Sequence, residues 1–120
     1  KETIYSYIKK AVTDGKTVFT IAASTRGNTL LQYCGLDSSL IKAAGERNPE
    51  KWGKYIASVG IPIISEEEMR KLKPDIILIL PWFFVSEIKD REVEYLENGG
   101  IFLIPLYLPK LITKEGEIEL

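Results

Sequence analysis

Short apolar runs alternate with amphipathic segments along the chain. The runs are rich in β-branched and aromatic residues and are bounded by glycine, proline or polar turns, which favours strands over helices. We predict five strands from them, at Val18–Ala22, Leu40–Gly45, Ile61–Ile64, Asp75–Leu80 and Ile101–Pro105. The segments between them carry apolar residues every three or four positions, the spacing of a helix with one buried face. We predict helices over Glu2–Thr13, Asn28–Tyr33, a segment from Ser65 to near Lys73, and Phe84–Glu97.

This alternation of strands and helices predicts the fold class. Helical crossovers between successive strands are right-handed and produce a parallel sheet with helices on both faces. We therefore expect one α/β domain over residues 1–120, a three-layer doubly wound fold. Its mostly parallel five-stranded sheet would have the order 3-2-1-4-5. Residues 1–15 would form a lead-in helix, and the tail from Leu106 would be irregular.

Individual positions add detail to the predicted elements. Ser65 and Glu68 have the spacing of a capping box that begins a helix. Pro62 lacks a backbone N–H, so its strand suits a sheet edge. Asp75–Leu80 is continuously apolar after its first residue, as expected of a strand covered on both faces. The inward residues expected on the first helix are Ile4, Tyr7, Ile8, Ala11 and Val12, and those on the last helix are Val85, Ile88, Val93 and Leu96.

The turn after the first predicted strand is the leading candidate for a binding site. A loop between a parallel strand and a helix points backbone N–H groups and the positive end of the helix dipole at one spot, which suits an anion. A side chain such as that of Arg26 adds a planar donor fork that fits phosphate. The turn has only Gly27 of a dinucleotide fingerprint, so a plain strand–helix connector is an equal alternative. The candidate residues are Ser24, Thr25, Arg26, Gly27 and Asn28.

Two more segments are expected at the same sheet edge, because parallel strands end there together. Glu46 follows the first strand at about the spacing of an acidic residue that binds a ribose hydroxyl. The alternative for Glu46 is a solvated carboxylate at a strand end. The aromatic side chains Trp52 and Tyr55 suit the wall of a base pocket, although such residues more often pack on a sheet edge. The candidates in these two segments are Glu46, Arg47 and Asn48, with Pro81 and Trp82.

Composition excludes several function classes. The 16 Lys and Arg against 17 Asp and Glu give a net charge of −1, without the basic excess of a nucleic-acid binder. The chain has no histidine, which excludes a Ser-His-Asp triad and a His-ligated metal site within it, and we expect it to bind no metal. The single cysteine, Cys34, fits a reducing cytoplasm, and no run is long enough to span a membrane. We find no pairing of a nucleophile with a base that would make the chain catalytic by itself.

Several segments together resemble the C-terminal domain of sugar C-methyltransferases that use S-adenosylmethionine. The resemblance covers most of the chain from Thr17 on. Where the family usually has Lys and Asp, this chain has Arg26 and Glu46, so the charges are kept. The matching segments are RGNTLLQYCGL (Arg26–Leu36), ERNPEKWGKY (Glu46–Tyr55), IPIISEEE (Ile61–Glu68), KPDIILILPW (Lys73–Trp82) and YLENGGIFLIPL (Tyr95–Leu106).

The resemblance implies a Rossmann-like domain that binds a nucleotide-linked sugar and positions it for methyl transfer. It also implies a preceding domain in the same polypeptide that binds S-adenosylmethionine and holds the catalytic His, Glu and Tyr residues. This chain alone would then bind no cofactor and transfer no methyl group. Two alternatives stay open: a free-standing nucleotide- or coenzyme-binding module that regulates a partner, and a structural domain that has lost its pocket.

Overall fold

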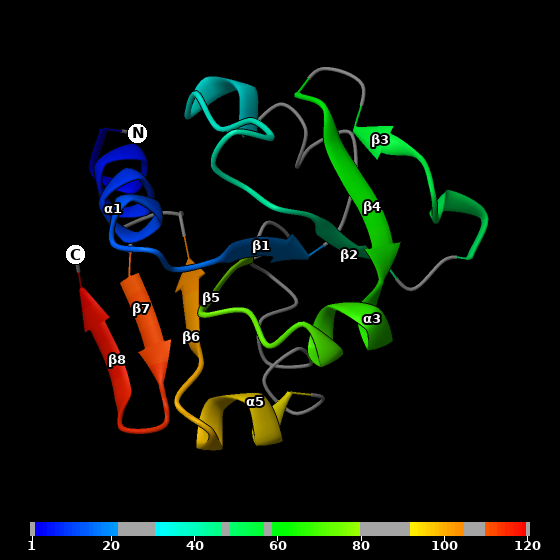
Figure 1. Cartoon of the computed structure of the whole chain (residues 1–120). Helices are drawn as coiled ribbons and strands as arrows, with labels where there is room; N and C mark the ends of the chain where they lie inside the picture. The colour runs from blue at the N-terminus through cyan, green and yellow to red at the C-terminus, as the bar shows by residue number, and fades with distance from the viewer. Residues whose placement is uncertain are drawn as a thin grey trace.

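One mixed β-sheet forms the centre of the molecule (Figure 1). The computed structural model describes residues 2–21, 31–46, 49–56, 59–79, 92–104 and 110–119. Within these ranges the sheet has eight strands, in the order β3-β4-β2-β1-β5-β6-β7-β8. The predicted fold class, a five-stranded and mostly parallel doubly wound sheet, is therefore wrong. Three further strands overturn it, and all of them pair antiparallel: β3 outside β4, and the hairpin β7–β8 beside β6.

The elements are short. The strands are β1 (Val18–Ile21), β2 (Ala44–Glu46), β3 (Tyr55–Ile56), β4 (Ile61–Ser65), β5 (Ile76–Ile79), β6 (Ile101–Ile104), β7 (Lys110–Thr113) and β8 (Gly116–Glu119). The helices are α1 (Glu2–Thr13), a 3-10 turn η1 (Pro49–Lys51), α3 (Glu66–Lys71) and α5 (Val93–Glu97). Among the described residues, no helix combines the length and the apolar character needed to cross a membrane.

The middle of the sheet is parallel. The strand β1 lies between β2 and β5, with Thr20 opposite Ala44 on one side and Leu78 on the other. The neighbours β2 and β4 are also parallel, as are β5 and β6. The carboxyl ends of β1, β2, β4, β5 and β6 therefore point the same way.

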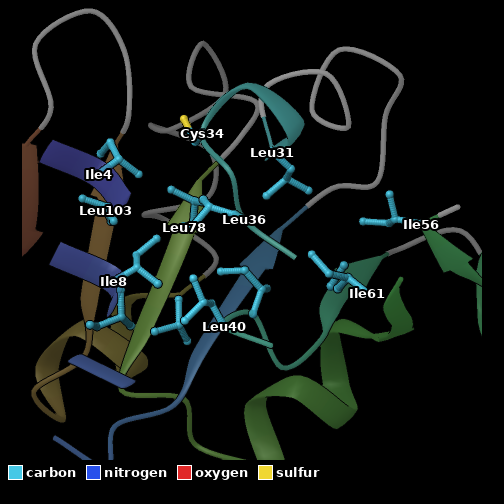
Figure 2. Close-up of a cluster of buried hydrophobic side chains, with 14 of the residues drawn as sticks. Ile4, Ile8, Leu31, Cys34, Leu36, Leu40, Ile56, Ile61, Leu78 and Leu103 are labelled. Atoms are coloured by element: carbon cyan, nitrogen blue, oxygen red, sulfur yellow. The ribbon is translucent and has the colours of Figure 1, made fainter. Parts of the chain in front are cut away.

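Alternate residues of the central strands face opposite layers of the core. In β5, Ile76 and Leu78 belong to one apolar cluster, whereas Ile77 and Ile79 belong to another. The first cluster contains Ile4 and Ile8 of α1, which confirms the predicted inward face of that helix (Figure 2). Figure 2 also shows Leu31, Cys34, Leu36 and Leu40, from the segment that precedes β2, pointing into this cluster.

The other face of the sheet is covered by α3 and α5. Met69 of α3 and Leu96 of α5 are buried there in one apolar cluster with residues of β1, β5 and β6, and α3 itself packs on β2 and β4. Val93, predicted to point inward from the same helix as Leu96, is 48% exposed, so that prediction is wrong. The predicted helix Phe84–Glu97 is described only from Val93, and Val85 and Ile88 lie outside the described residues.

Two further expectations need correction. The tail beyond Leu106 is not irregular throughout, because residues 110–119 form the β7–β8 hairpin. Pro62 does not lie in an edge strand, since β3 pairs on the outer side of β4. The position tolerates proline because the ladder between β4 and β2 begins at Ile63, so the missing N–H breaks no bond of that ladder.

Candidate functional site

The predicted site is described at one of its ten residues, Glu46. The other nine lie outside the described residues, and their roles stay predictions: Ser24, Thr25, Arg26, Gly27, Asn28, Arg47, Asn48, Pro81 and Trp82. Of the predicted site, only the surroundings of Glu46 can therefore be described, and the meeting of the three segments stays a prediction.

Glu46 is the last residue of β2 and lies opposite Ser65, the last residue of β4. Its side chain is only 14% exposed, so Glu46 is not the solvated carboxylate of the alternative interpretation. The ammonium nitrogen Nζ of Lys51 is 3.7 Å from the Glu46 carboxylate oxygen Oε1. A negative and a positive group thus lie together at the carboxyl ends of two parallel strands.

The close packing of α3 fixes this end of β2. A Cβ atom at Gly45 would lie 2.8 Å from the Met69 sulfur, so a glycine lets the helix approach the strand closely. The helix begins immediately after β4, where the Ser65 hydroxyl accepts a hydrogen bond from the Glu68 N–H at 3.0 Å. This contact confirms the predicted cap at Ser65. Because Ser65 is also the residue opposite Glu46, the start of α3 lies beside Glu46.

The turn from Pro49 to Lys54 returns the chain to the same place. The Gly53 N–H donates to the Ile63 carbonyl at 3.0 Å, and the Ile63 N–H donates to the Lys54 carbonyl at 2.8 Å. The indole N–H of Trp52 donates to the backbone carbonyl of Glu46 at 2.7 Å. Trp52 stays 43% exposed in this position. We call Glu46, Lys51 and Trp52 the carboxyl-edge cluster.

The carboxyl-edge cluster offers three kinds of contact in a small area. The Glu46 carboxylate accepts hydrogen bonds, the Lys51 ammonium attracts anions, and the indole of Trp52 presents a flat apolar surface. In open sheets with parallel strands, ligands bind beyond the carboxyl ends. The arrangement therefore suits a ligand that combines a hydroxyl or amide, a negative charge and a flat ring.

A cavity of about 650 Å³ lies at the opposite edge of the sheet, which the sequence prediction did not anticipate. It lies where β5 and β6 begin, because Asp75 and Gly100 immediately precede these strands. We call it the amino-edge cavity, and its lining residues are Arg70, Lys73, Pro74, Asp75, Glu92, Glu94, Tyr95, Asn98, Gly99 and Gly100.

Much of the charge in the amino-edge cavity is already satisfied within the protein. Arg70 donates from Nε and Nη2 to the carboxylate of Glu92, with the shortest distance 2.7 Å. This contact raises the pKa of the Arg70 guanidinium. The Asp75 carboxylate accepts from the Thr17 N–H at 2.8 Å. These contacts join α3 to the start of α5 and β1 to β5, which is a structural role.

Tyr95 closes one wall of the same cavity. Its hydroxyl donates to the Ile101 carbonyl at 3.2 Å and accepts from the Ile101 N–H at 3.1 Å. Burial raises the pKa of this hydroxyl, so it stays protonated at neutral pH. A Cβ at Gly100 would come within 2.5 Å of the ring, which explains the glycine at this position. Tyr95 is thus held by backbone contacts and does not act as a base.

Sequence reasoning missed the contact between Trp52 and Glu46 and the pair of Arg70 and Glu92. The second pair joins residues 22 positions apart, a separation that no local pattern encodes. The first depends on where a backbone carbonyl points, although the aromatic residue next to Lys51 was a usable signal.

Comparison with known proteins supports one family. Residues 1–107 match the sequence model described as the C-methyltransferase C-terminal domain. The chain is 38% identical over 115 residues to a protein of Streptomyces niveus named C-methyltransferase NovU. That match covers 96% of this chain and 27% of the relative, so the chain spans about a quarter of the relative's length.

Proposed function

Because this chain belongs to the C-methyltransferase C-terminal domain family, we propose that it binds a nucleotide-linked sugar and positions it for methyl transfer. The transfer would be carried out by a domain outside this chain, which would bind S-adenosylmethionine and supply the methyl group. In the proposal this chain holds the acceptor, binds no cofactor or metal, and works in the cytoplasm, as its single cysteine favours.

The carboxyl-edge cluster carries the proposal. It brings the Glu46 carboxylate, the Lys51 ammonium and the Trp52 indole to the carboxyl ends of β2 and β4. A nucleoside diphosphate carries hydroxyls, phosphates and a flat base, which match these three groups. Arg26, predicted in the turn after β1, would add a second cation for the diphosphate.

Holding an acceptor in a fixed place is itself a catalytic contribution. A correctly oriented reactant converts a step between two molecules into one within a complex, which lowers the barrier substantially. A chain without a base or nucleophile of its own therefore still contributes to the rate of methyl transfer.

Calorimetric titration with uridine diphosphate tests the proposal. Arg26→Ala should weaken binding by roughly 1.5–3 kcal/mol, the contribution of a charge-assisted hydrogen bond. Glu46→Gln should change the preference among nucleotides, because an amide replaces a pure acceptor. Lys71→Ala and Glu67→Gln are matched controls, since they make the same charge changes at an exposed pair on α3.

Each alternative gives a different result. A structural domain without a pocket would leave the parent chain unable to bind uridine diphosphate. If the control variants lose as much affinity for uridine diphosphate, the losses reflect the general surface charge and not a specific site. A free-standing regulatory module would bind the nucleotide in the same way, but its complete reading frame would lack a domain for S-adenosylmethionine.

A further inference from the structure

Trp52 is fixed in place and yet remains open to solvent. Its indole N–H is bonded to the Glu46 carbonyl at 2.7 Å, and its backbone N–H donates to the Pro49 carbonyl at 3.2 Å. The next residue, Gly53, is bonded to β4 through Ile63. Despite these anchors the residue is 43% exposed. A tryptophan that serves only packing would bury more of its ring against the sheet.

The anchoring contact also uses up the polar part of the side chain. Because the indole N–H is already bonded, the rest of the side chain offers only apolar, aromatic surface to a ligand. An aromatic face held in one orientation binds a flat ring with little loss of conformational entropy. The neighbouring Glu46 and Lys51 supply an acceptor and a cation within the same cluster.

We propose that the exposed indole face of Trp52 is the platform on which the base of the acceptor's nucleoside diphosphate stacks. This inference rests on the proposed function and deepens it, since it assigns the base to a residue. Stacking tolerates different bases, because every base has a flat aromatic face. Trp52 would thus select nucleotides over simple phosphates, whereas Glu46 would discriminate among nucleotides.

A comparison of two ligands isolates the stacking contact. Uridine diphosphate carries the base, and inorganic pyrophosphate carries the same charge pattern without it. Trp52→Leu should weaken the binding of uridine diphosphate about five- to a hundredfold and leave the binding of pyrophosphate unchanged. Trp52→Phe keeps an aromatic face but loses the bond to Glu46, so it should bind uridine diphosphate more tightly than Trp52→Leu. Tyr5→Leu is the control, because Tyr5 is similarly exposed, at 39%, on α1.

The parent chain gives a second readout, in which a variant serves only to assign one resonance. The indole N–H resonance of Trp52, assigned by its loss in Trp52→Phe, should shift with uridine diphosphate and stay in place with pyrophosphate. The proposal is overturned if the nucleotide does not shift that resonance. It is also overturned if Trp52→Leu binds uridine diphosphate like the parent, or if this variant loses affinity for both ligands equally. In those cases, losses in Arg26→Ala and Glu46→Gln would leave the proposed function standing. A parent that binds no nucleotide would end both proposals.

Discussion

Arg70 and Glu92 form the shortest ion pair among the described residues, and the two partners have different surroundings. The Glu92 side chain is 2% exposed, whereas that of Arg70 is 45% exposed. Losing the arginine therefore leaves a carboxylate without compensation in the interior, but losing the carboxylate leaves an arginine that water reaches. Removing Arg70 should therefore cost more unfolding free energy than removing the charge of Glu92.

Replacement of each partner should show this asymmetry. Arg70→Met keeps the apolar stem and should cost roughly 3 kcal/mol of unfolding free energy, because a buried charge loses its partner. Glu92→Gln keeps an acceptor for the guanidinium and should cost about 1 kcal/mol. Urea unfolding at neutral pH measures both. Equal losses would mean that Glu92 is solvated and that the pair is an ordinary surface bridge.

Asp37 provides a prediction for pH. Its carboxylate accepts from the Ser39 hydroxyl and the Ser39 N–H, and these bonds lower the pKa of Asp37. A lowered pKa in the folded state stabilises the fold above the ordinary Asp range, and this contribution is lost as the pH falls through the lowered pKa. Ser39→Ala should move the pKa of Asp37 back up, as a carbon-detected NMR titration measures. Ser38→Ala is the control, and an unchanged Asp37 pKa in Ser39→Ala would contradict the cause.

The outcome at single residues depended on how local each interaction is. The cap at Ser65 was predictable because its partner Glu68 is three residues away. The buried positions Ile4 and Ile8 were predictable because their spacing marks one face of a helix. The exposure of Val93 was not, because it depends on how the short helix α5 sits on the sheet. Nothing in the sequence indicated Glu92 as buried, since glutamate is normally on the surface.

At the scale of elements, the best-predicted ones are those with a strong pattern. The helix α1 ends as expected, with the Lys16 N–H bonded to the Ala11 carbonyl beyond Gly15 at a φ of +86°. Strands β3 and β8 were not predicted, because β3 has only two residues and every residue of β8 is exposed. Their existence depends on the partner strands β4 and β7.

The central strand β5 should dominate stability among the strands. Ile77 and Leu78 are each 1% exposed and face opposite layers of the core. Replacing either by Ala should cost about 2–5 kcal/mol, because each substitution leaves a cavity in a packed interior. The control is Ile118→Ala on β8, where the side chain is 55% exposed and the loss should stay below about 0.5 kcal/mol. Denaturant unfolding decides the matter, and losses below ~1 kcal/mol at both core positions would contradict the central place of β5.

At the scale of the whole molecule, the sheet has two chemically different edges. The carboxyl-edge cluster presents a carboxylate, an ammonium and an exposed indole. In the amino-edge cavity, Arg70 is paired with Glu92, and the Asp75 carboxylate accepts from the Thr17 N–H. Because ligands of sheets with parallel strands bind beyond the carboxyl ends, the strand direction favours the first place. The sequence predicted this preference from parallel strands, although it missed the mixed sheet that surrounds them.

Mapping of backbone amide shifts on the parent chain with uridine diphosphate shows at which end of the parallel strands the ligand binds. Among the described residues, we expect the largest shifts at Glu46, Lys51, Trp52 and Ser65, since these surround the carboxyl ends of β2 and β4. Largest shifts at Arg70, Lys73 and Asn98 would place the ligand in the amino-edge cavity instead. That result, or a spectrum that does not change, would contradict binding of the nucleotide at the carboxyl-edge cluster.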